Sequence, residues 1–279
     1  ELDEKYLFKI SQKISNNTSN IIELYPYAQI TRNKVPDDIQ NFYISHEGFI
    51  GVFDEELKED DYDDIEEKKI VREANKGWLG ITDKYWMTAL VPEQGKNFKS
   101  TFLYKNAFKA NYILNDPITI QPSSKNSSNL RVFVAAKEVE TIDVYAANQN
   151  IEKLDLVIDW GWFYFFTKPL FFVIDYLFKI SGNFGIAIVL ITIGIRLLFF
   201  PLANYSFRSM AKMKALQPEM VRLKEVYKED KVKLQQEMMA LYRKEKVNPA
   251  SGCLPILIQI PFFFAIYKML FISLEMRHQ

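Results

Sequence analysis

The stretch that decides the fold is FGIAIVLITIGIRLLFFPL, residues 184–202. It carries one charged side chain, that of Arg196. A helix rises about 1.5 Å per residue, so this run spans close to the ~30 Å hydrocarbon core of a bilayer. A second apolar run of similar length covers residues 253–274. The two runs predict transmembrane helices, which we place at 182–204 and 251–275.

The segment between the two spans, residues 205–250, is highly charged. Residues 205–246 hold eleven basic and six acidic side chains, a net charge of +5. A short positive loop between two spans stays in the cytoplasm. The first span then runs inward, the second returns, and the preceding domain lies outside, in the periplasm of a Gram-negative cell.

This charged segment also shows helical periodicity. Apolar side chains recur at helical spacing in two stretches separated by a polar break at residues 228–231. They are Met210, Met213, Leu216, Met220, Leu223 and Tyr227, then Leu234, Met238 and Leu241. Two such stripes predict an antiparallel helical hairpin, with Pro218 perturbing its first arm. Its methionines either offer a soft binding surface for apolar segments or pack the two arms together.

Residues 1–152 predict a separate antiparallel β-sandwich. Short β-branched and aromatic runs alternate there with turn residues. These runs are 21–25, 42–44, 49–53, 102–104, 112–114, 118–120 and 130–134. The second and third of them flank a plausible hairpin turn at 45–48. We interpret the acidic run from Asp54 to Asp64 as a solvated loop.

Residues 153–181 join this sandwich to the first span. Their second half is dense in aromatic residues, and its charged side chains are Lys168, Asp175 and Lys179. At about 100° per residue these three fall within about 40° of one another. One narrow polar stripe on an aromatic helix is typical of an interfacial helix that lies along a membrane surface. The alternative is a buried helix of a soluble domain, which the two following spans argue against.

Arg196 is the residue that most needs an explanation, because a guanidinium inside a span costs about 2.5 kcal/mol or more. In one interpretation its long side chain reaches the cytoplasmic interface. In the other it faces a hydrophilic cavity, with Thr192 one turn earlier on the same face and Gln259 at a similar depth on the second span. Lys268, near the periplasmic end of its span, is expected to reach the interface.

Composition and motifs argue against several other functions. The formal net charge is +0, which excludes a simple basic nucleic-acid-binding protein. The single cysteine, Cys253, makes no intrachain disulfide, and the two histidines, His46 and His278, are far apart and lack neighbouring metal ligands. Nucleotide-binding loops and nucleophile elbows are absent from the sequence. The sequence therefore argues against a zinc site and a His-based catalytic triad.

Several long motifs of the second half resemble YidC-type membrane protein insertases, of the YidC/Oxa/Alb family. They are 185–196, ending in Phe200-Pro201-Leu202; 209–213 with 216–218; 236–242; 245–249; and 252–255 through 259–261. The resemblance is strong over residues 155–279. In the first half it rests on Gly77-Trp78-Leu79-Gly80 and on 85–92, which are similar to the large periplasmic domain of Gram-negative members.

The resemblance implies a protein that inserts and folds inner-membrane proteins, alone or beside the Sec translocon. It also implies no enzymatic activity and no nucleotide, metal or other cofactor. It implies a groove open to the cytoplasm and to lipid, with its arginine at Arg196 and with Thr192 and Gln259 among its lining residues. The implied partners are nascent membrane proteins, the ribosome or targeting factors, and membrane lipid. The periplasmic domain would resemble a sugar-binding β-supersandwich.

Compared with the family, the chain is expected to be a segment of a longer protein, truncated at both ends. It would lack a first membrane anchor and three later transmembrane helices that supply much of the groove. Three other functions stay open at this point. They are a membrane-tethered periplasmic protein that binds or modifies carbohydrate, a transporter with Arg196 as its anion site, and a scaffold for the Sec machinery.

Overall fold

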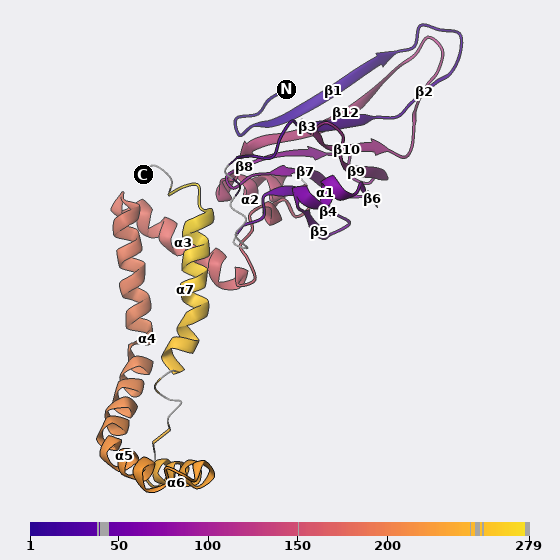
Figure 1. The fold of residues 1–279 in the computed structure, drawn as a ribbon. Coiled ribbons are helices and arrows are strands. Elements are labelled where there is room, and N and C mark those ends of the chain that lie inside the picture. The colour runs from indigo at the N-terminus through magenta and orange to yellow at the C-terminus, as the bar shows by residue number, and fades with distance from the viewer. Residues whose placement is uncertain are drawn as a thin grey trace. The chain divides into compact units, whose positions relative to one another are not determined.

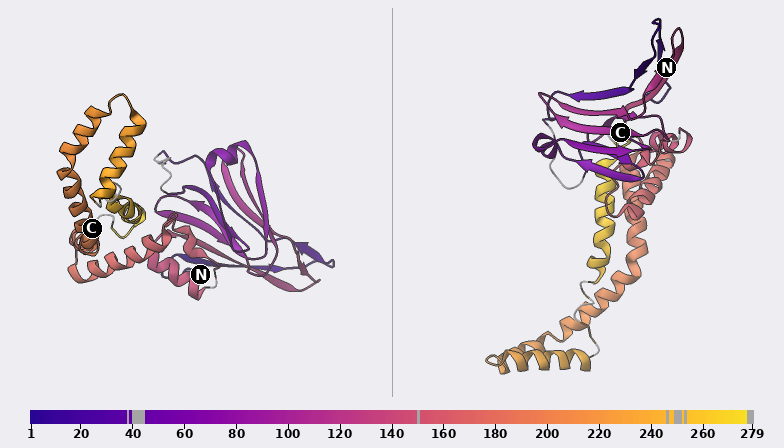
Figure 2. Two further views of the ribbon diagram at one scale, coloured as in Figure 1. Left: turned by 90° about the horizontal axis from the view of Figure 1, so that it is seen from below. Right: turned by 90° about the vertical axis from the view of Figure 1, so that its right-hand side faces the viewer.

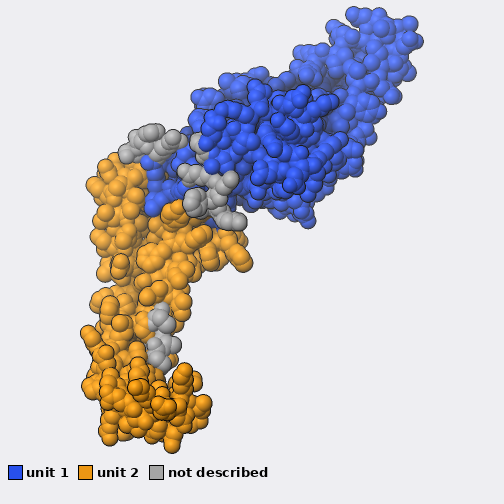
Figure 3. Space-filling view, in the orientation of Figure 1, with its two compact units in different colours: residues 1–161, 270–278 blue, residues 162–269, 279 orange. Residues whose placement is uncertain are grey.

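The computed structural model describes residues 1–37, 39, 45–149, 151–245, 247–248, 252 and 254–276. The chain divides into two units, shown in different colours in Figure 3. Unit 1 consists of residues 1–161 and 270–278, and unit 2 of residues 162–269 and 279. The sandwich domain predicted to end at residue 152 therefore continues to Gly161.

Unit 1 contains most of the strands expected from the sequence and several more. Its strands are β1 Leu7–Ser15, β2 Ile22–Leu24, β3 Tyr27–Arg32, β4 Gly48–Phe53, β5 Glu56–Asp60, β6 Ile70–Ala74, β7 Gly77–Thr82, β8 Trp86–Val91, β9 Phe98–Tyr104, β10 Phe108–Leu114, β11 Ile118–Ile120 and β12 Lys125–Ala136. Its helices are α1 Tyr62–Glu67, α2 Val139–Asn148 and a 3₁₀ turn at Leu154–Val157. The predicted strand at 42–44, and with it the hairpin that it would form, lies outside the described residues.

The strands form two main antiparallel sheets, which confirms the predicted sandwich. One sheet has the order β1-β12-β8-β7-β4-β5, and the other has the order β3-β10-β9-β6. The paired strands β1 and β12 continue past the rest of the sandwich, and the small sheet of β2 and β11 lies at their far end (Figures 1 and 2). Nδ2 of the buried Asn16 donates a 3.0 Å hydrogen bond to the Ile120 carbonyl there.

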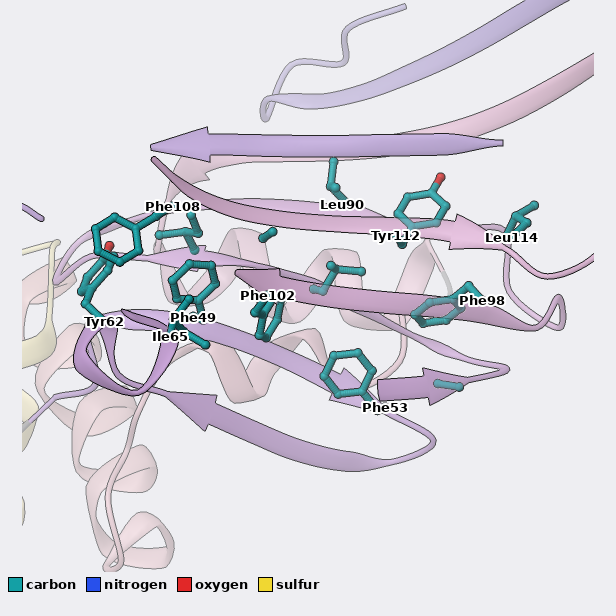
Figure 4. Packing of buried hydrophobic residues seen from close by; sticks show 14 residues of the cluster. Phe49, Phe53, Tyr62, Ile65, Leu90, Phe98, Phe102, Phe108, Tyr112 and Leu114 are labelled. Atoms are coloured by element: carbon teal, nitrogen blue, oxygen red, sulfur yellow. The ribbon is translucent and has the colours of Figure 1, made fainter. Parts of the chain in front are cut away.

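The core lies between the two main sheets and is rich in phenylalanine (Figure 4). Phe49 of β4 packs against Phe102 of β9, with ring centroids 5.0 Å apart, and against Tyr62 of α1 at 5.7 Å. Fully burying one such ring contributes roughly 1.5–3 kcal/mol. The Phe49–Phe102 contact therefore helps to hold the two facing sheets together.

The acidic side chains of the run from Asp54 to Asp64 are solvated as predicted except at Asp60, but the run is not a loop. It forms β5 and the first turn of α1, and Asp60 is buried. The Arg72 guanidinium donates two hydrogen bonds to the Asp60 carboxylate, at 2.6 and 2.8 Å, and lies over the Phe53 ring. A bidentate partner makes burial of this carboxylate tolerable.

Unit 2 is helical, and its helix bounds differ from the predicted ones. They are α3 Tyr164–Ser181, α4 Phe184–Ala215, α5 Gln217–Val226, α6 Lys231–Lys244 and α7 Leu254–Ile272. The interfacial segment predicted to begin at residue 153 begins its helix at Tyr164, because residues 154–157 form the 3₁₀ turn of unit 1. The first span, predicted to end at residue 204, continues as one helix to Ala215.

Two of these helices are long and apolar enough to cross a membrane. The most apolar windows of α4 and α7 have mean hydropathies of 2.4 and 1.8. The hairpin predicted over residues 205–250 is made by α5 and α6 alone. Pro218 lies in the first turn of α5, where proline is tolerated, so it starts a helix and does not kink one.

Candidate functional site

The packing of α4 changes abruptly halfway along the helix. Its first half buries three side chains, those of Phe184, Ala187 and Ile191, and the next buried residue is Ser206. From Thr192 to Tyr205 every side chain is exposed or half-buried. In the part of the chain that the structure describes, α4 therefore presents an open surface that begins at Thr192.

The first half of α4 is held by α3. The Phe178 ring of α3 stacks on the Phe184 ring of α4, with centroids 3.8 Å apart and planes 5° apart. Thr167, Phe171 and Ile174 are the buried residues of α3. The packed part of unit 2 therefore lies beside the N-terminal half of α4.

Arg196 lies on the open surface. It follows Thr192 by four residues, so the two side chains share one face of α4. The Thr192 hydroxyl donates a 2.7 Å hydrogen bond to the Ile188 carbonyl. Among the described residues, the Arg196 guanidinium forms no hydrogen bond or ion pair. An exposed arginine without such a partner is available to an incoming anionic group.

Helices α4 and α7 run antiparallel, and the rings of Phe199 and Phe262 lie 4.9 Å apart. The Ser206 hydroxyl of α4 donates a 3.1 Å hydrogen bond to the carbonyl of Gly252, two residues before α7. The buried alanines Ala187 and Ala265 are small residues in otherwise bulky spans. Such residues allow close helix approach and are the sequence signal for these packed surfaces.

The Phe199–Phe262 contact also sets the depth of the predicted site residues. Arg196 precedes Phe199 by three residues, and Gln259 precedes Phe262 by three on an antiparallel helix. Side chains lean toward the N-terminus of their own helix, so the two rings meet between Cα atoms that are offset along the helix axis. The structure groups Arg196 with Thr192 and places both Arg196 and the half-buried Gln259 within about one turn of this ring contact.

Lys268 departs from expectation. Lys268 is only 2% exposed and interacts with a neighbouring group, so its side chain does not extend away from the protein. Lys268 lies six residues after Phe262, and Thr192 lies seven residues before Phe199 on the antiparallel helix. Both therefore lie on the same side of the Phe199–Phe262 contact. Sequence reasoning missed this buried cation because a lone lysine near a helix end usually reaches the interface.

The methionines of the hairpin differ in their surroundings. Met220 and Met238 are half-buried, and the Tyr242 hydroxyl lies 3.8 Å from the Met220 sulfur across the hairpin. Met239 is exposed on α6. Met210 is also exposed, but it and Met213 lie on the extension of α4 and not on the hairpin. Some methionines therefore pack the arms, and others remain open to a partner.

Unit 1 contains a small polar cavity of about 170 Å³ beside the ion pair of Arg32 and Asp83. The guanidinium donates two hydrogen bonds to Asp83, at 2.5 and 2.7 Å, and one to the Tyr62 hydroxyl at 2.7 Å. The bonds to Asp83 raise the pKa of Arg32, and burial raises the pKa of Tyr62. Both Asp83 and Asp60 are held in bidentate ion pairs, so neither is placed as a free acid or base.

The other candidate chemical group of unit 1 is His46. Its Nε2 lies 2.9 Å from the Phe49 carbonyl, and its Nδ1 lies 3.5 Å from Asp61. The ring is therefore engaged at the start of β4. Among the described residues, no group of three or more His, Cys, Asp or Glu side chains is arranged to hold a metal.

Both halves of the chain match known families. Residues 1–173 match the model of the YidC periplasmic domain, and residues 176–279 match that of the 60Kd inner membrane protein. A membrane protein insertase YidC of Pelagibacter ubique (strain HTCC1062) is 58% identical over 99% of this chain and 50% of its own length. The protein of the same name from Brucella melitensis biotype 1 is 44% identical over 99% of this chain and 46% of its own length.

Among solved structures, a crystal structure of an active YidC insertase with its first transmembrane domain resolved gives a TM-score of 0.38 at 19% identity. That match covers 81% of this chain and 62% of the other. The chain spans about half the length of the curated relatives that it matches.

Proposed function

The chain belongs to the YidC family of membrane protein insertases, and from this premise we propose that it inserts and helps to fold proteins of the bacterial inner membrane. The observation that carries the proposal is the 58% identity, over 99% of this chain, to a protein named as an insertase. Insertion makes and breaks no covalent bond, so the role requires no catalytic residue. The open surface of α4 around Arg196 is where the substrate contacts the protein during insertion.

The proposed topology follows from charge. Residues 205–246 carry a net charge of +5 and include the end of α4, α5 and α6, so this end of unit 2 is cytoplasmic. The sandwich of unit 1 is then periplasmic. Helix α3 exposes aromatic side chains such as Phe165, Phe172 and Tyr176, and it lies along the periplasmic surface of the bilayer.

In this orientation the closed and open parts of α4 have distinct roles. The packed half, up to Ile191, faces the periplasm and seals that side. The half from Thr192 onward forms a wall of a groove that opens toward the cytoplasm. Gln259, Thr192 and Arg196 line this groove.

Arg196 attracts the acidic or polar tail of a substrate into this groove. Two unit charges 4 Å apart attract by about 1 kcal/mol in water but by about 4 kcal/mol at an effective dielectric constant of about 20. In a partly dehydrated groove, an arginine therefore attracts an acidic group more strongly than the same arginine would on a water-exposed surface. The tail then has a shorter apolar distance left to cross.

The hairpin of α5 and α6 receives the substrate before the groove does. Exposed side chains such as Met239 and Val232 suit contact with apolar segments, and the basic side chains suit the ribosome or targeting factors. We include the Sec translocon as a partner on family grounds. Among the described residues of unit 1, Asp60 and Asp83 are both held in ion pairs, which argues against the alternative of a carbohydrate-modifying protein.

Reconstitution tests the proposed function. The protein in proteoliposomes is mixed with a single-span substrate that has a short acidic tail, and protease-protected substrate is measured without nucleotide. We expect protection well above that in protein-free vesicles, and none for a substrate whose apolar span is replaced by polar residues. Equal protection with and without the protein would contradict the proposal.

A further inference from the structure

The end of α7 is attached to a defined face of the sandwich. Residues 270–278 belong to unit 1, although α7 itself ends at Ile272. The Lys84 ammonium, in the turn between β7 and β8, lies 3.5 Å from the centroid of the Phe271 ring. The Val139 amide, at the start of α2, donates a 3.0 Å hydrogen bond to Glu275 Oε1.

These contacts locate the membrane surface on unit 1. The last turn of a spanning helix lies where hydrocarbon gives way to lipid headgroups. Lys84 touches that turn, and the start of α2 touches the residues that follow it. The end of β8 that begins at Trp86, two residues after Lys84, therefore lies at the level of the headgroups.

The same face holds a groove with exposed aromatic walls. The cavity has a volume of about 660 Å³, and Leu274, two residues past the end of α7, forms part of its lining. Tyr6, Trp86 and Val134 also line it and are 61%, 59% and 42% exposed. Large apolar side chains gathered at one site and left open mark a surface that meets an apolar partner.

The chemistry of this groove matches a phospholipid. Tyrosine and tryptophan prefer the headgroup level, where the ring lies among acyl chains and its polar atom stays hydrated. Lys5 and Glu138 also line the cavity, with their charged groups 3.8 Å apart. A cation and an anion side by side complement the phosphate and ammonium of a zwitterionic headgroup. Continuity with the end of the span selects lipid over a soluble partner.

We propose that the groove of Tyr6, Trp86, Val134 and Leu274 binds phospholipid of the leaflet next to the sandwich, so that unit 1 rests on the membrane by a second attachment besides its covalent links. The attachment is separate from insertion at Arg196. It requires that α7 spans the bilayer, but not that the protein inserts substrates.

Fluorescent labelling tests this proposal. The single native cysteine is first removed by Cys253→Ser. One new cysteine is then introduced, by Trp86→Cys or, as a second position, by Val134→Cys, and an environment-sensitive dye is attached to it. The matched control is Ile21→Cys, because Ile21 is 57% exposed and precedes β2 at the far end of the β1–β12 pair (Figure 1). Each labelled protein is placed in nanodiscs of zwitterionic lipid, with or without spin-labelled headgroups.

We expect the spin labels to quench the dye at residues 86 and 134 at least about twofold more than at residue 21, as expected for side chains at the interface. Aqueous iodide should quench in the opposite order. Equal quenching at all three positions would overturn the proposal, because the groove would then face water. A dye at 86 or 134 that is shielded from iodide yet not quenched by lipid would also overturn it, in favour of a protein partner.

Discussion

Replacing Arg196 by alanine should lower the insertion of a substrate with an acidic tail by at least about tenfold, which corresponds to about 1.4 kcal/mol. The reason is the loss of the only charge that the open surface of α4 offers between Thr192 and Tyr205. Arg196→Lys keeps the charge but not the planar guanidinium, so partial activity is expected. The measurement is protease-protected substrate in proteoliposomes at matched protein content.

Two comparisons make this prediction specific to charge in the groove. Arg208→Ala removes an exposed arginine from the same helix, three turns later, and should leave insertion nearly unchanged. A substrate with a neutral tail should be much less sensitive to Arg196→Ala than one with an acidic tail. If the alanine variant inserts the acidic substrate as well as the native protein, Arg196 reaches the interface or packs, and hydration of the groove becomes the better explanation.

Gly77→Ala should destabilise the sandwich strongly, with a loss of about 3 kcal/mol or more in the free energy of unfolding. Gly77 has a φ of +123°, and a Cβ there would lie 1.8 Å from the Val52 carbonyl oxygen. Its amide and carbonyl are both bonded to the Gln94 side chain at 2.9 Å, so the backbone has no room to move. The measurement is the urea dependence of proteolysis of unit 1 in the solubilised protein.

Gly95→Ala is the matched control, since Gly95 has a φ of +84° and nothing within 4 Å of its Cβ position. It should cost only about 1 kcal/mol, the ordinary strain of a left-handed alanine. A Gly77→Ala protein as stable as Gly95→Ala would show that strand β4 shifts freely, against the packing described here.

The motif Gly77-Trp78-Leu79-Gly80 shows how sequence and structure complement each other. The sequence marked it only as a family resemblance. The structure gives its physical reason: Gly77 and Gly80 allow close approach of neighbouring strands, and Trp78 is fully buried with its indole N–H bonded to the Glu152 carbonyl at 3.1 Å. Periodicity cannot reveal such contacts, because they join residues far apart in the chain.

The apolar spans and the β-rich first half were predictable because each depends on local pattern. The buried Asp60 was not, because only the distant Arg72 makes its burial tolerable. The end of α4 was misplaced because residues 203–215 become polar without containing a helix breaker. The change from apolar to polar sequence marks where the helix leaves the membrane, not where it ends. The helix itself ends just before Gln217-Pro218.

The site was predictable in part for the same reason. A shared helical face linked Thr192 to Arg196 from spacing alone. The position of Gln259 relative to Arg196 depends on how α7 packs against α4, for instance through the contact between the Phe199 and Phe262 rings. Likewise, the burial of Lys268 follows from packing that no local pattern encodes.

In the proposed function, substrate enters the membrane along the face of α4 that carries Arg196. The most direct measurement places a photoreactive phenylalanine analogue at Thr192, one turn from Arg196, or at Ile186, an exposed position on the packed half of the same helix. A substrate stalled during insertion is then crosslinked by light. We expect strong crosslinking from position 192 and little from position 186. Equal crosslinking from both positions, or crosslinking from 186 alone, would contradict it.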